Sequence, residues 1–465
     1  MTIVDRTRKV HFVGIGGSGM SGIAEILCRS GHTVTGSDLN ESETISRLRE
    51  LGAEVQIGHS EKILKKVKPD VLVFSTAVSR DNPELVYARG MKIPLIRRAE
   101  MLGELMRLRR GIAVAGSHGK TTTTGLLSLI LREGDLDPTV VIGGRFNAIG
   151  SNAKWGEGPW LVAEADESDG SFNRLTPEMA IVTNIDREHL NHYGSFEATL
   201  DAFEDFLDRL PFYGKAVLCS DCPHVRSVIK TLNKSFVTYG FEEEHGPDFL
   251  VRITENSATP KFTIEMSSEE TSTASLEEVE FQLSVPGRHN VLNASAAAVM
   301  GLSLGVSVEK IAAALRSFSG VSRRFEVRGN WQCGTLVEDY AHHPTEIRAT
   351  IEAALTSFKK APVIVFQPHR YSRTRELWDD FSTCFEGAHK VFTLPIFAAS
   401  EARELWGDDF DGVYFARNIK NADAEFVEDF ALAKEKINEQ FSGNDRPLLV
   451  LGAGNIAKLI PELLK

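Results

Sequence analysis

The stretch that decides the fold of the N-terminal part is "VHFVGIGGSGMSGIAEIL", residues 10–27. An apolar run leads into Gly14, Gly16 and Gly19, and a helical pattern follows directly. A glycine loop between a strand and a helix is typical of a Rossmann-like fold that binds a pyrophosphate. Asp38 follows about twenty residues later, where a dinucleotide fold places the acid that binds the ribose. The stretch therefore predicts a nucleotide site, with NAD as one candidate ligand.

The bulk composition limits the classes of protein. The chain has 465 residues, which is too long for one hydrophobic core, so two or three domains are expected. A net charge of -12 argues against a broad basic face for nucleic acid. The apolar runs are too short to cross a membrane, and five scattered cysteines indicate a reducing compartment. We expect a soluble, cytoplasmic monomer or homodimer that binds neither nucleic acid nor membranes.

Strand and helix signals alternate along the first part of the chain. Strands are expected at 9–16, 32–38, 53–58 and 70–78, with helices at 21–31 and 43–52. Alternation of this kind predicts a parallel, doubly wound sheet. We expect an N-terminal Rossmann-like α/β domain over residues 1–109.

Two further α/β domains are expected after it. The central domain, 110–321, has buried strands at 111–117, 138–144, 160–166, 179–186 and 215–221. Its polar stretch 255–285 is interpreted as an exposed antiparallel hairpin inserted in the domain, or as a partly disordered loop. The C-terminal domain, 322–465, has strands at 334–344, 361–369, 390–397 and 447–455 and is again Rossmann-like.

The strongest local signal is "GSHGKTTTT", residues 116–124, between an expected strand and an expected helix. Backbone N–H groups at such a turn bind phosphate. Lys120 supplies a cation for the phosphate oxygens, and Thr121 supplies a hydroxyl to Mg²⁺. The full eight-position motif has glycine where this chain has Val114, so the match is to its second half. A glycine turn that only caps a helix is the alternative interpretation.

Acidic side chains follow two of the expected buried strands, in "EADESDGSF" (164–172) and "TNIDREHL" (183–190). Carboxylates at the carboxyl ends of parallel strands face the crevice where ligands bind, and they suit Mg²⁺. Taken alone, each segment is also consistent with a solvated loop. Because a phosphate loop is also present, a metal site is the favoured interpretation of these acidic segments.

Three smaller clusters have two interpretations each. His289, Asn290 and Asn293 stand at an expected helix start, where they cap the helix or hydrogen-bond a base. The arginines of "HRYSRTR" (369–375) suit a carboxylate or phosphate, or simply form a surface helix. Cys219 and Cys222 are read as a turn after a strand, because a zinc site needs a second pair of ligands.

Seven motifs occur in order along the chain: "GSHGKTTTT", "EADESDGSF", "TNIDREHL", "GRHNVLNASAA", "RRFEVRG", "DYAHHPTE" and "HRYSRTR". Together they resemble the Mur ligase family of ATP-dependent amide-forming enzymes, over nearly the whole chain. Folylpolyglutamate and cyanophycin synthetases share the middle motifs. The first glycine loop, with "FSTAV" and "IRRAEML", is most similar to the branch that joins L-alanine to UDP-N-acetylmuramate. The nearest alternative branch joins a recycled murein tripeptide to the same nucleotide sugar.

The resemblance implies a reaction as well as a fold. The lactyl carboxylate of UDP-N-acetylmuramate attacks the γ-phosphate of ATP, and the amine of L-alanine then displaces phosphate from the acyl phosphate. The first domain then binds the UDP-sugar, the central domain binds ATP, and the C-terminal domain binds the amino acid. The first glycine loop holds the pyrophosphate of UDP in this interpretation, not that of NAD.

The resemblance also assigns residues to each ligand. The UDP-sugar-binding residues are Gly14, Gly16, Gly17, Ser18, Gly19, Met20, Ser75, Thr76 and Arg98. The ATP-binding residues are Gly116, Ser117, His118, Gly119, Lys120, Thr121, Thr122, His289, Asn290, Asn293, Arg324 and Asp339. Two Mg²⁺ ions are expected on Thr121, Glu167 and His189, and alanine on Tyr340, His342, Arg370 and Arg373. The catalytic group is Lys120, Glu167, His189 and His342, with His342 as the general base.

Two other function classes are open on the residues alone. An NAD-dependent oxidoreductase could be built on the first glycine loop, but it leaves the second loop and its acids unexplained. A phosphate-loop switch would hydrolyse ATP without any amino acid. The ligase hypothesis accounts for both loops, the acidic clusters and the arginine cluster together.

Overall fold

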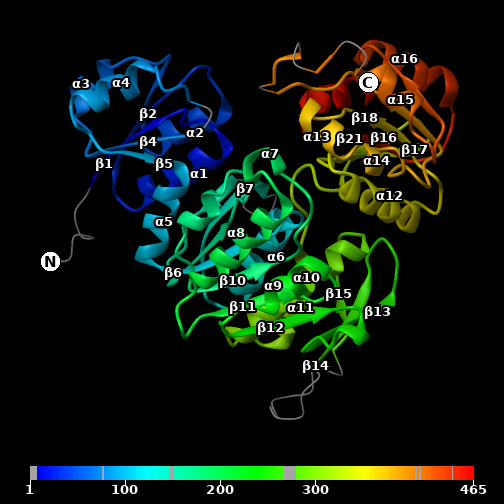
Figure 1. Ribbon diagram of the computed structural model, residues 1–465, viewed down its shortest axis with the longest axis horizontal. Coiled ribbons are helices and arrows are strands. Elements are labelled where there is room, and N and C mark those ends of the chain that lie inside the picture. Colours follow the sequence, from blue (N-terminus) through cyan, green and yellow to red (C-terminus); the bar gives the residue numbers. More distant parts are fainter. Residues whose placement is uncertain are drawn as a thin grey trace. The chain divides into compact units, whose positions relative to one another are not determined.

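Three β-sheets with flanking helices build the described parts of the chain (Figure 1). The computed structural model describes residues 8–75, 78–146, 151–266, 279–399, 401–403, 406–407, 410–441 and 443–464. The chain divides into two compact units. The first unit holds Met1–Leu250 and Ala296–Ala314, and the second holds Val251–Ser295 and Leu315–Lys465.

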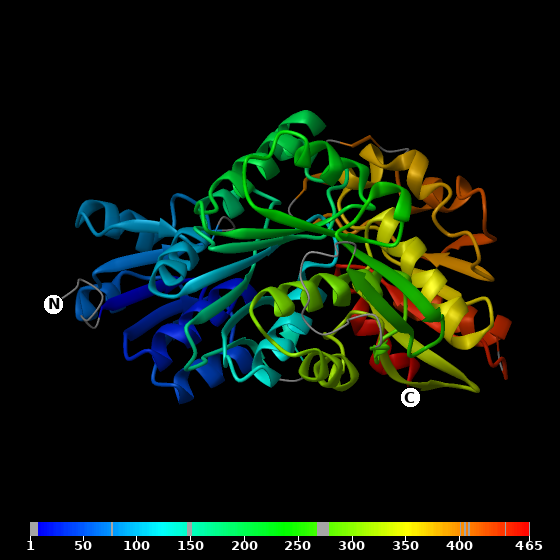
Figure 2. The ribbon, with the colours of Figure 1, turned by 90° about the horizontal axis from the view of Figure 1, so that it is seen from below.

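The first sheet is parallel throughout, in the order β3-β2-β1-β4-β5. Its strands are β1 (Lys9–Val13), β2 (Thr33–Asp38), β3 (Glu54–Ile57), β4 (Val71–Phe74) and β5 (Leu95–Arg97). Its helices are α1 (Ser18–Arg29), α2 (Glu43–Glu50), α3 (Lys62–Val67), α4 (Pro83–Gly90) and α5 (Arg98–Leu108). Helices lie on both faces of the strands (Figure 2). The expected doubly wound arrangement is confirmed.

The central sheet, as far as β12, also lies in the first unit. Its order is β12-β11-β10-β6-β9-β7-β8, parallel except for β8. The strands are β6 (Arg110–Ala115), β7 (Thr139–Phe146), β8 (Ser151–Lys154), β9 (Trp160–Glu164), β10 (Met179–Val182), β11 (Lys215–Cys219) and β12 (Phe236–Gly240). The helices are α6 (Lys120–Glu133), α7 (Leu190–Tyr193), α8 (Phe196–Asp208) and α9 (Pro223–Ile229).

Beyond β12 the sheet order continues with β13 (Phe249–Glu255), β14 (Lys261–Met266) and β15 (Phe281–Gln282). In the second unit β14 and β15 pair antiparallel, as the expected hairpin requires. Residues 267–278 of that hairpin lie outside the described residues. The helices α10 (Arg288–Ser303) and α11 (Val308–Ser317) follow.

The third sheet lies wholly in the second unit, in the order β16-β17-β21-β18-β19-β20. The strands are β16 (Glu326–Trp331), β17 (Gly334–Asp339), β18 (Val363–Phe366), β19 (Lys390–Thr393), β20 (Ala424–Phe426) and β21 (Leu448–Leu451). Only β16 is antiparallel to its neighbour among these pairs. The helices are α12 (Pro344–Phe358), α13 (Tyr371–Glu376), α14 (Trp378–Phe381), α15 (Gly412–Arg417), α16 (Phe430–Phe441) and α17 (Ile460–Leu463).

Both faces of the parallel strands are apolar, which is why these strands read as continuous hydrophobic runs. In β1, Phe12 packs into one core cluster while Val13 packs into another. In β18, Ile364 and Val365 likewise enter two different clusters. No helix in the described ranges has the length and apolar character needed to cross a membrane.

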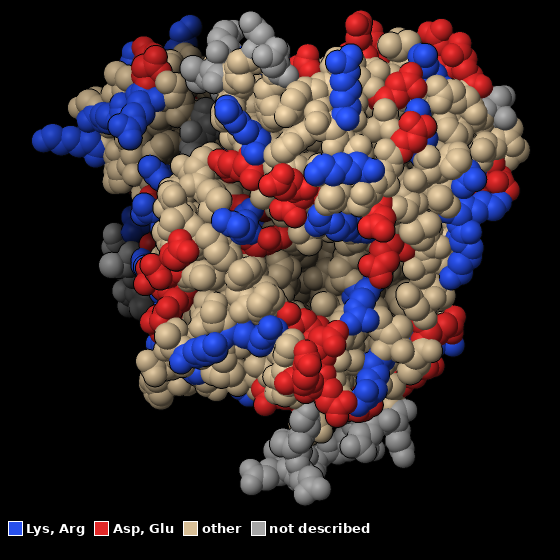
Figure 3. All heavy atoms as spheres, turned by 45° about the vertical axis from the view of Figure 1, so that its right-hand side comes forward, with Lys and Arg blue, Asp and Glu red and all other residues tan. Residues whose placement is uncertain are grey.

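Charged side chains of both signs lie on the surface, and the cysteines are unpaired. On the face shown in Figure 3, acidic and basic side chains are interspersed. All five cysteines are free thiols. Cys219 and Cys222 flank the turn between β11 and α9, where Cys222 Sγ accepts a hydrogen bond from the Ile185 backbone N–H.

A buried polar network stabilises the first sheet around Glu84 of α4, which is fully buried. Its carboxylate accepts hydrogen bonds from the Ser37 hydroxyl (2.7 Å), the Gln56 amide (2.9 Å) and the Ser60 N–H (2.9 Å). His11 Nε2 lies 3.1 Å from the same carboxylate. Burial opposes ionisation, but His11 and Ser37 hold the pKa of Glu84 below its ordinary value. The folded state therefore holds a charged group in its interior.

Replacing Glu84 by alanine should leave these buried partners unsatisfied. We expect Glu84→Ala to lower the free energy of unfolding by about 3 kcal/mol, measured as a lower midpoint of thermal unfolding by calorimetry. Glu54→Ala is the control, because Glu54 pairs with Lys66 at the surface and such pairs contribute under about 1 kcal/mol. Equal effects of the two substitutions would contradict a stabilising role for the network.

Candidate active site

The phosphate loop lies between β6 and α6, at the carboxyl edge of the central sheet. Two residues that directly follow the neighbouring strand β10 hydrogen-bond to the loop. The Ser117 N–H donates to the Asn184 carbonyl, the His118 N–H donates to Asn184 Oδ1 (2.9 Å), and the Thr183 hydroxyl donates to the His118 carbonyl (2.6 Å). Gly116 has a φ of +131°, and a Cβ there would stand 2.1 Å from Thr183 Oγ1. The loop is therefore held in one conformation that needs glycine.

Lys120 is the first residue of α6 and folds back into the loop. Its ammonium donates to the Gly116 carbonyl (2.6 Å), the Ser117 carbonyl (3.0 Å) and Glu167 Oε1 (2.9 Å). Burial alone would lower the pKa of Lys120, but Glu167 and the neighbouring Glu164 raise it well above its ordinary value. The cation is thus retained inside the protein, beside the loop.

Glu167 is 2% exposed and is the most buried carboxylate at this edge. Burial raises the pKa of Glu167 to about 7, against the opposing effect of Lys120. Glu164, at the end of β9, accepts a hydrogen bond from the Thr121 hydroxyl (3.1 Å) and another from the Gly143 N–H (2.7 Å). The Thr121 hydroxyl therefore points to Glu164, while Lys120 points to Glu167.

Glu167, Glu188 and His189 form a group that could hold a divalent cation. One ligand atom from each lies within 4.8 Å of the others. His189 Nε2 is 3.7 Å from Glu167 Oε1 and 3.6 Å from Glu188 Oε2. His189 adopts a left-handed backbone with φ of 58° just before α7, which turns its ring toward the carboxylates. Carboxylate oxygens are the donors that Mg²⁺ prefers.

The first glycine loop follows β1. Gly14 has a φ of 77°, and its N–H donates to the Ser37 carbonyl of β2 (2.8 Å). Asp38, at the end of β2, accepts a hydrogen bond from the Gly16 N–H (2.9 Å). Its carboxylate thus fixes the loop in this structure. Gly17 precedes α1, Ser18 begins it, and Met20 is buried.

Gly19 lets an arginine lie against α1. A Cβ on Gly19 would stand 2.8 Å from Arg98 Nη1, and Arg98 Nη2 is 3.3 Å from Asp166 Oδ2. Asp166 belongs to the same acidic segment as Glu167. Within the first unit, this ion pair joins the start of α5 to the acidic segment after β9. Ser75 is partly buried just after β4, and Thr76 lies outside the described residues.

In the second unit, aromatic and cationic side chains gather after β17 and β18. The Tyr340 ring lies 5.2 Å from the His342 ring, which lies 5.9 Å from the His369 ring. Arg373 Nη1 is 3.3 Å from His369 Nδ1. Arg370 Nε is buried and has no hydrogen-bond partner among the described residues. Burial, with help from Arg373 and Arg370, lowers the pKa of His369 to about 4, so the imidazole is neutral near pH 7.

The other expected residues of the second unit have structural partners. The Asn290 amide donates to the Pro286 carbonyl (2.7 Å), and the Asn293 amide donates to Asn290 Oδ1 (3.3 Å). His289 stands close to Gly287, whose φ is 104°. Asp339 directly precedes Tyr340, and Arg324 lies near the Tyr340 ring.

Asp339 accepts backbone hydrogen bonds from Phe325 and Ala341, both at 2.7 Å. Burial raises the pKa of Asp339 to about 6, against Arg324 and these N–H donors. Arg324 donates to Glu346 Oε1 (3.1 Å), and its guanidinium lies 5.1 Å from the Tyr340 ring centroid. Asp339 therefore orders the segment that carries Arg324.

The structure gathers the predicted residues in two groups. In the first unit it brings Lys120, Glu167 and His189 together, with Thr121 beside Glu164 and Thr122 buried within α6. In the second unit it brings Tyr340 and His342 near His369 and Arg373. Sequence reasoning gave no role to Glu188 or His369. In the sequence, only their positions directly before His189 and Arg370 in the quoted motifs pointed to them.

The fold and the site define a phosphate-loop α/β protein with a candidate cation site beside the loop. Family models match three consecutive ranges: the Mur ligase family catalytic domain at 9–110, the Mur ligase middle domain at 114–301, and the Mur ligase glutamate ligase domain at 323–454. These ranges cover most of the chain. The chain belongs to the Mur ligase family.

Similar proteins cover the whole length. The UDP-N-acetylmuramate–L-alanine ligase of Anaeromyxobacter dehalogenans (strain 2CP-C) is 46% identical over 460 residues, 99% of this chain and 98% of that protein. The protein of the same name from Rhodopseudomonas palustris (strain TIE-1) is 45% identical, over 97% and 95%. The crystal structure of UDP-N-acetylmuramate–alanine ligase from Thermotoga maritima superposes with a TM-score of 0.78 at 29% identity, covering 98% of both chains.

The murein peptide ligase of Psychrobacter arcticus also shares the fold. Its TM-score is 0.70 at 23% identity, over 98% of both chains. At this identity the likeness concerns the fold alone.

The support of the phosphate loop gives a testable prediction. Thr183→Val keeps the shape of the side chain but removes the hydrogen bond to the His118 carbonyl. We expect the Kd for Mg-ADP, measured by calorimetry, to rise about fivefold, which corresponds to about 1 kcal/mol for one hydrogen bond. Thr199→Val is the matched control, because Thr199 donates to a backbone carbonyl in α8, away from the loop. An unchanged Kd for Thr183→Val would mean that this bond does not order the loop.

Proposed function

We propose that the chain is an ATP-dependent ligase that joins L-alanine to the lactyl carboxylate of UDP-N-acetylmuramate. The products are UDP-N-acetylmuramoyl-L-alanine, ADP and phosphate, in peptidoglycan synthesis. The observation that carries the proposal is 46% identity, over 99% of the chain, to a ligase with this name. The buried cation and carboxylates around the phosphate loop fit phosphoryl transfer, which depends on concentrated positive charge. Dependence on ATP favours a cytoplasmic enzyme.

The three substrates are assigned to three domains. Residues 1–109 bind the UDP-sugar, 110–321 bind ATP and 322–465 bind the amino acid. The ranges of the three family models support these boundaries. Each domain presents the carboxyl edge of a parallel sheet, where ligands of open α/β folds bind.

The UDP pyrophosphate is assigned to the first glycine loop. The Gly17 N–H donates to the Gly14 carbonyl, so the N–H groups at the start of α1 provide the donors for phosphate oxygens. Arg98 adds a positive charge beside Gly19. Because Gly16 donates to Asp38, that carboxylate already has a role in shaping the loop. The remaining assigned residues of this site are Ser18, Met20, Ser75 and Thr76.

ATP and its metal are assigned to the carboxyl edge of the central sheet. Lys120 stands where it can contact the β- and γ-phosphates. Glu167, Glu188 and His189 have the donor types and the spacing of a cation site, so the residues fit Mg²⁺. When bound, Mg²⁺ neutralises the charge that builds up as two anions approach. We assign one ion to Thr121 and Glu167 and a second to Glu167 and His189.

The chemistry of the chain is the activation of a carboxylate. The lactyl carboxylate attacks the γ-phosphorus of ATP, the bond to ADP breaks, and an acyl phosphate forms. The neutral amine of alanine then attacks the acyl carbon and expels phosphate. Lys120 is held beside the loop by Glu167 and by the loop carbonyls, so its positive charge is in place to stabilise the transferring phosphoryl group.

Alanine is assigned to the cluster after β17 and β18. Arg370 and Arg373 form a fork for its carboxylate, and the buried Arg370 Nε is a donor that no described residue satisfies. Because the His369 ring is neutral, it adds no charge to the site, and the positive charges of Arg370 and Arg373 are left for the substrate carboxylate. Tyr340 and His342 lie beside the amine and the methyl group, with His342 as the general base. The nucleotide is assigned further contacts to His289, Asn290, Asn293, Arg324 and Asp339.

Phosphate release tests the proposal against its alternatives. With ATP and Mg²⁺ present, we expect release only when UDP-N-acetylmuramate and L-alanine are both added. Release with the tripeptide L-Ala-γ-D-Glu-meso-diaminopimelate, but not with alanine, would favour the recycling branch. Release without either co-substrate would indicate a switch, and NAD-dependent turnover without ATP would indicate an oxidoreductase.

The arginine fork is tested by a conservative substitution. A lysine cannot make a planar two-point contact with a carboxylate, so Arg370→Lys should raise the KM for L-alanine by at least about tenfold. The KM for ATP should change little. Arg375→Lys is the matched control, since Arg375 is an exposed residue of α13, the helix that Arg370 directly precedes. If Arg370→Lys raised the KM for ATP but not for alanine, the fork would belong to the nucleotide instead.

A further inference from the structure

The turn that carries the arginine fork has a strained backbone. Arg370 has a φ of 70° and a ψ of 136°, a combination that favours glycine over any residue with a side chain. Residues in such conformations persist where the surrounding structure holds them, and they gather at functional sites. Arg370 therefore depends on neighbouring groups that keep its backbone in this conformation.

The segment after β19 holds one side of this turn. β18 and β19 are parallel neighbours, and their pairing continues beyond them as a bridge between His369 and Phe397. The Phe397 N–H donates to the Pro368 carbonyl, and the Arg370 N–H donates to the Phe397 carbonyl, both at 2.8 Å. The Phe397 ring also stacks on the His369 ring, with 5.5 Å between the centroids. The backbone on either side of Arg370 is thus bonded to one short segment.

Glu401, a few residues further along the same segment, holds the other side. Its carboxylate accepts one hydrogen bond from the Ser372 N–H (3.1 Å) and a second from the Ser372 hydroxyl. Ser372 is buried, so these contacts are shielded from water. The Thr374 hydroxyl donates to the Arg370 carbonyl at 2.7 Å and closes the turn from within α13. The first turn of α13 is therefore fixed by a carboxylate that lies outside the helix.

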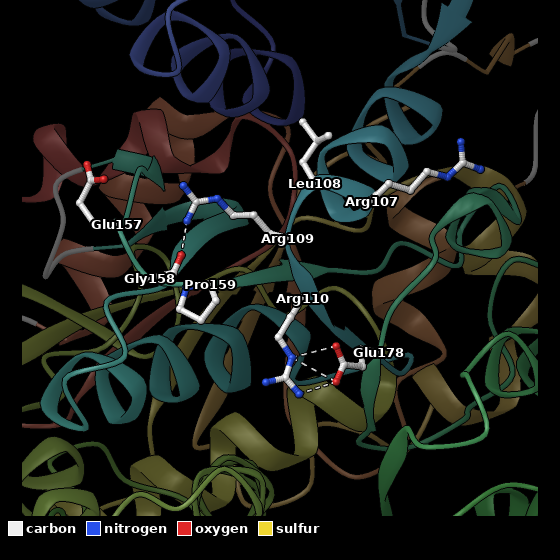
Figure 4. Close-up of a pocket in the computed structure, with 8 residues that line it drawn as sticks. All are labelled: Arg107, Leu108, Arg109, Arg110, Glu157, Gly158, Pro159 and Glu178. Carbon is white, nitrogen blue, oxygen red and sulfur yellow. Dashed lines mark hydrogen bonds and ion pairs between the residues drawn. The ribbon is translucent and has the colours of Figure 1, made fainter. Parts of the chain in front are cut away.

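The side chain of Arg370 differs from arginines whose contacts are satisfied within the protein. In the hollow shown in Figure 4, Arg110 forms a two-point ion pair with Glu178, and Arg109 donates to the Gly158 carbonyl. The buried Arg370 Nε, in contrast, has no hydrogen-bond partner among the described residues. The contacts around this turn thus hold the backbone of Arg370 and leave its Nε unoccupied.

We propose that Glu401 is a positioning residue for the amino-acid substrate. Through Ser372, it keeps the strained turn in the conformation that directs the Arg370 guanidinium to the substrate carboxylate. Both Glu401 oxygens are bonded to Ser372, so Glu401 acts through the turn and not on the substrate. This role rests on the proposed function, because it concerns the site assigned to alanine.

Loss of the Glu401 contact should weaken alanine binding selectively. Glu401→Gln keeps the size of the side chain but loses one acceptor, because its amide nitrogen meets a donor of Ser372. We expect the KM for L-alanine to rise at least about fivefold, with kcat at saturating alanine and the KM for ATP nearly unchanged. A substitution that only destabilised the fold would lower turnover at every alanine concentration, so the split between KM and kcat identifies positioning.

Two companion variants make the test specific. Ser372→Ala removes the hydroxyl contact and should raise the KM for L-alanine by a smaller factor. In the double variant, the rise should be less than the product of the two single effects, because both substitutions act on the same pair. Asp429→Ala is the matched control, because Asp429 also accepts a backbone N–H, that of Leu432 (2.8 Å), but at the start of α16.

The measurement is steady-state phosphate release by the full chain at saturating ATP, Mg²⁺ and UDP-N-acetylmuramate, with L-alanine varied and the thermal midpoint of each variant recorded. If Glu401→Gln is unfolded at the assay temperature, the KM split in Ser372→Ala decides. Wild-type release that does not depend on alanine would overturn the proposed function and this role together. If the wild type depends on alanine, an unchanged KM for alanine in Glu401→Gln, or an equal rise in Asp429→Ala, would overturn this role alone.

Discussion

The buried pair of Lys120 and Glu167 is the interaction on which the rest of the site depends. The two side chains neutralise each other inside the protein, with the ammonium also bonded to the Gly116 and Ser117 carbonyls. An isolated charge in this position would be costly, and the pair removes much of that cost. The arrangement keeps a cation and a carboxylate in place before any ligand arrives, which is what phosphoryl transfer requires of a protein.

Parallel sheets explain why so many polar groups meet at this point. The loops after β6, β9 and β10 come together because these strands are neighbours with the same direction. Thr183 and Asn184 then hold the phosphate loop, and the segment after β9 delivers Glu167 to Lys120. Arg98 links the first sheet to the same segment through Asp166. Within the first unit, an ion pair thus connects the start of α5 to the segment that carries Glu167.

Local patterns were enough to predict the fold. Strand runs, helix periodicity and the two glycine loops are encoded by neighbours in sequence, so all three α/β parts were predicted. The side-chain partners could not be predicted in this way. Asp38 has the sequence spacing of a ribose-binding acid, yet its carboxylate bonds to Gly16, because β1 and β2 are adjacent. Likewise, His369 meets His342 only through the packing of two strands separated by β21.

The central claim is that a carboxylate is activated by transfer of the γ-phosphoryl group at the Lys120 site. It is tested most directly with UDP-N-acetylmuramate labelled with ¹⁸O in both lactyl carboxylate oxygens. The account predicts that each amide formed releases one phosphate carrying one ¹⁸O, while the other label stays in the amide. Label in AMP would show activation through an adenylate instead. Phosphate without any label would show that ATP is hydrolysed separately, and either result would contradict the account.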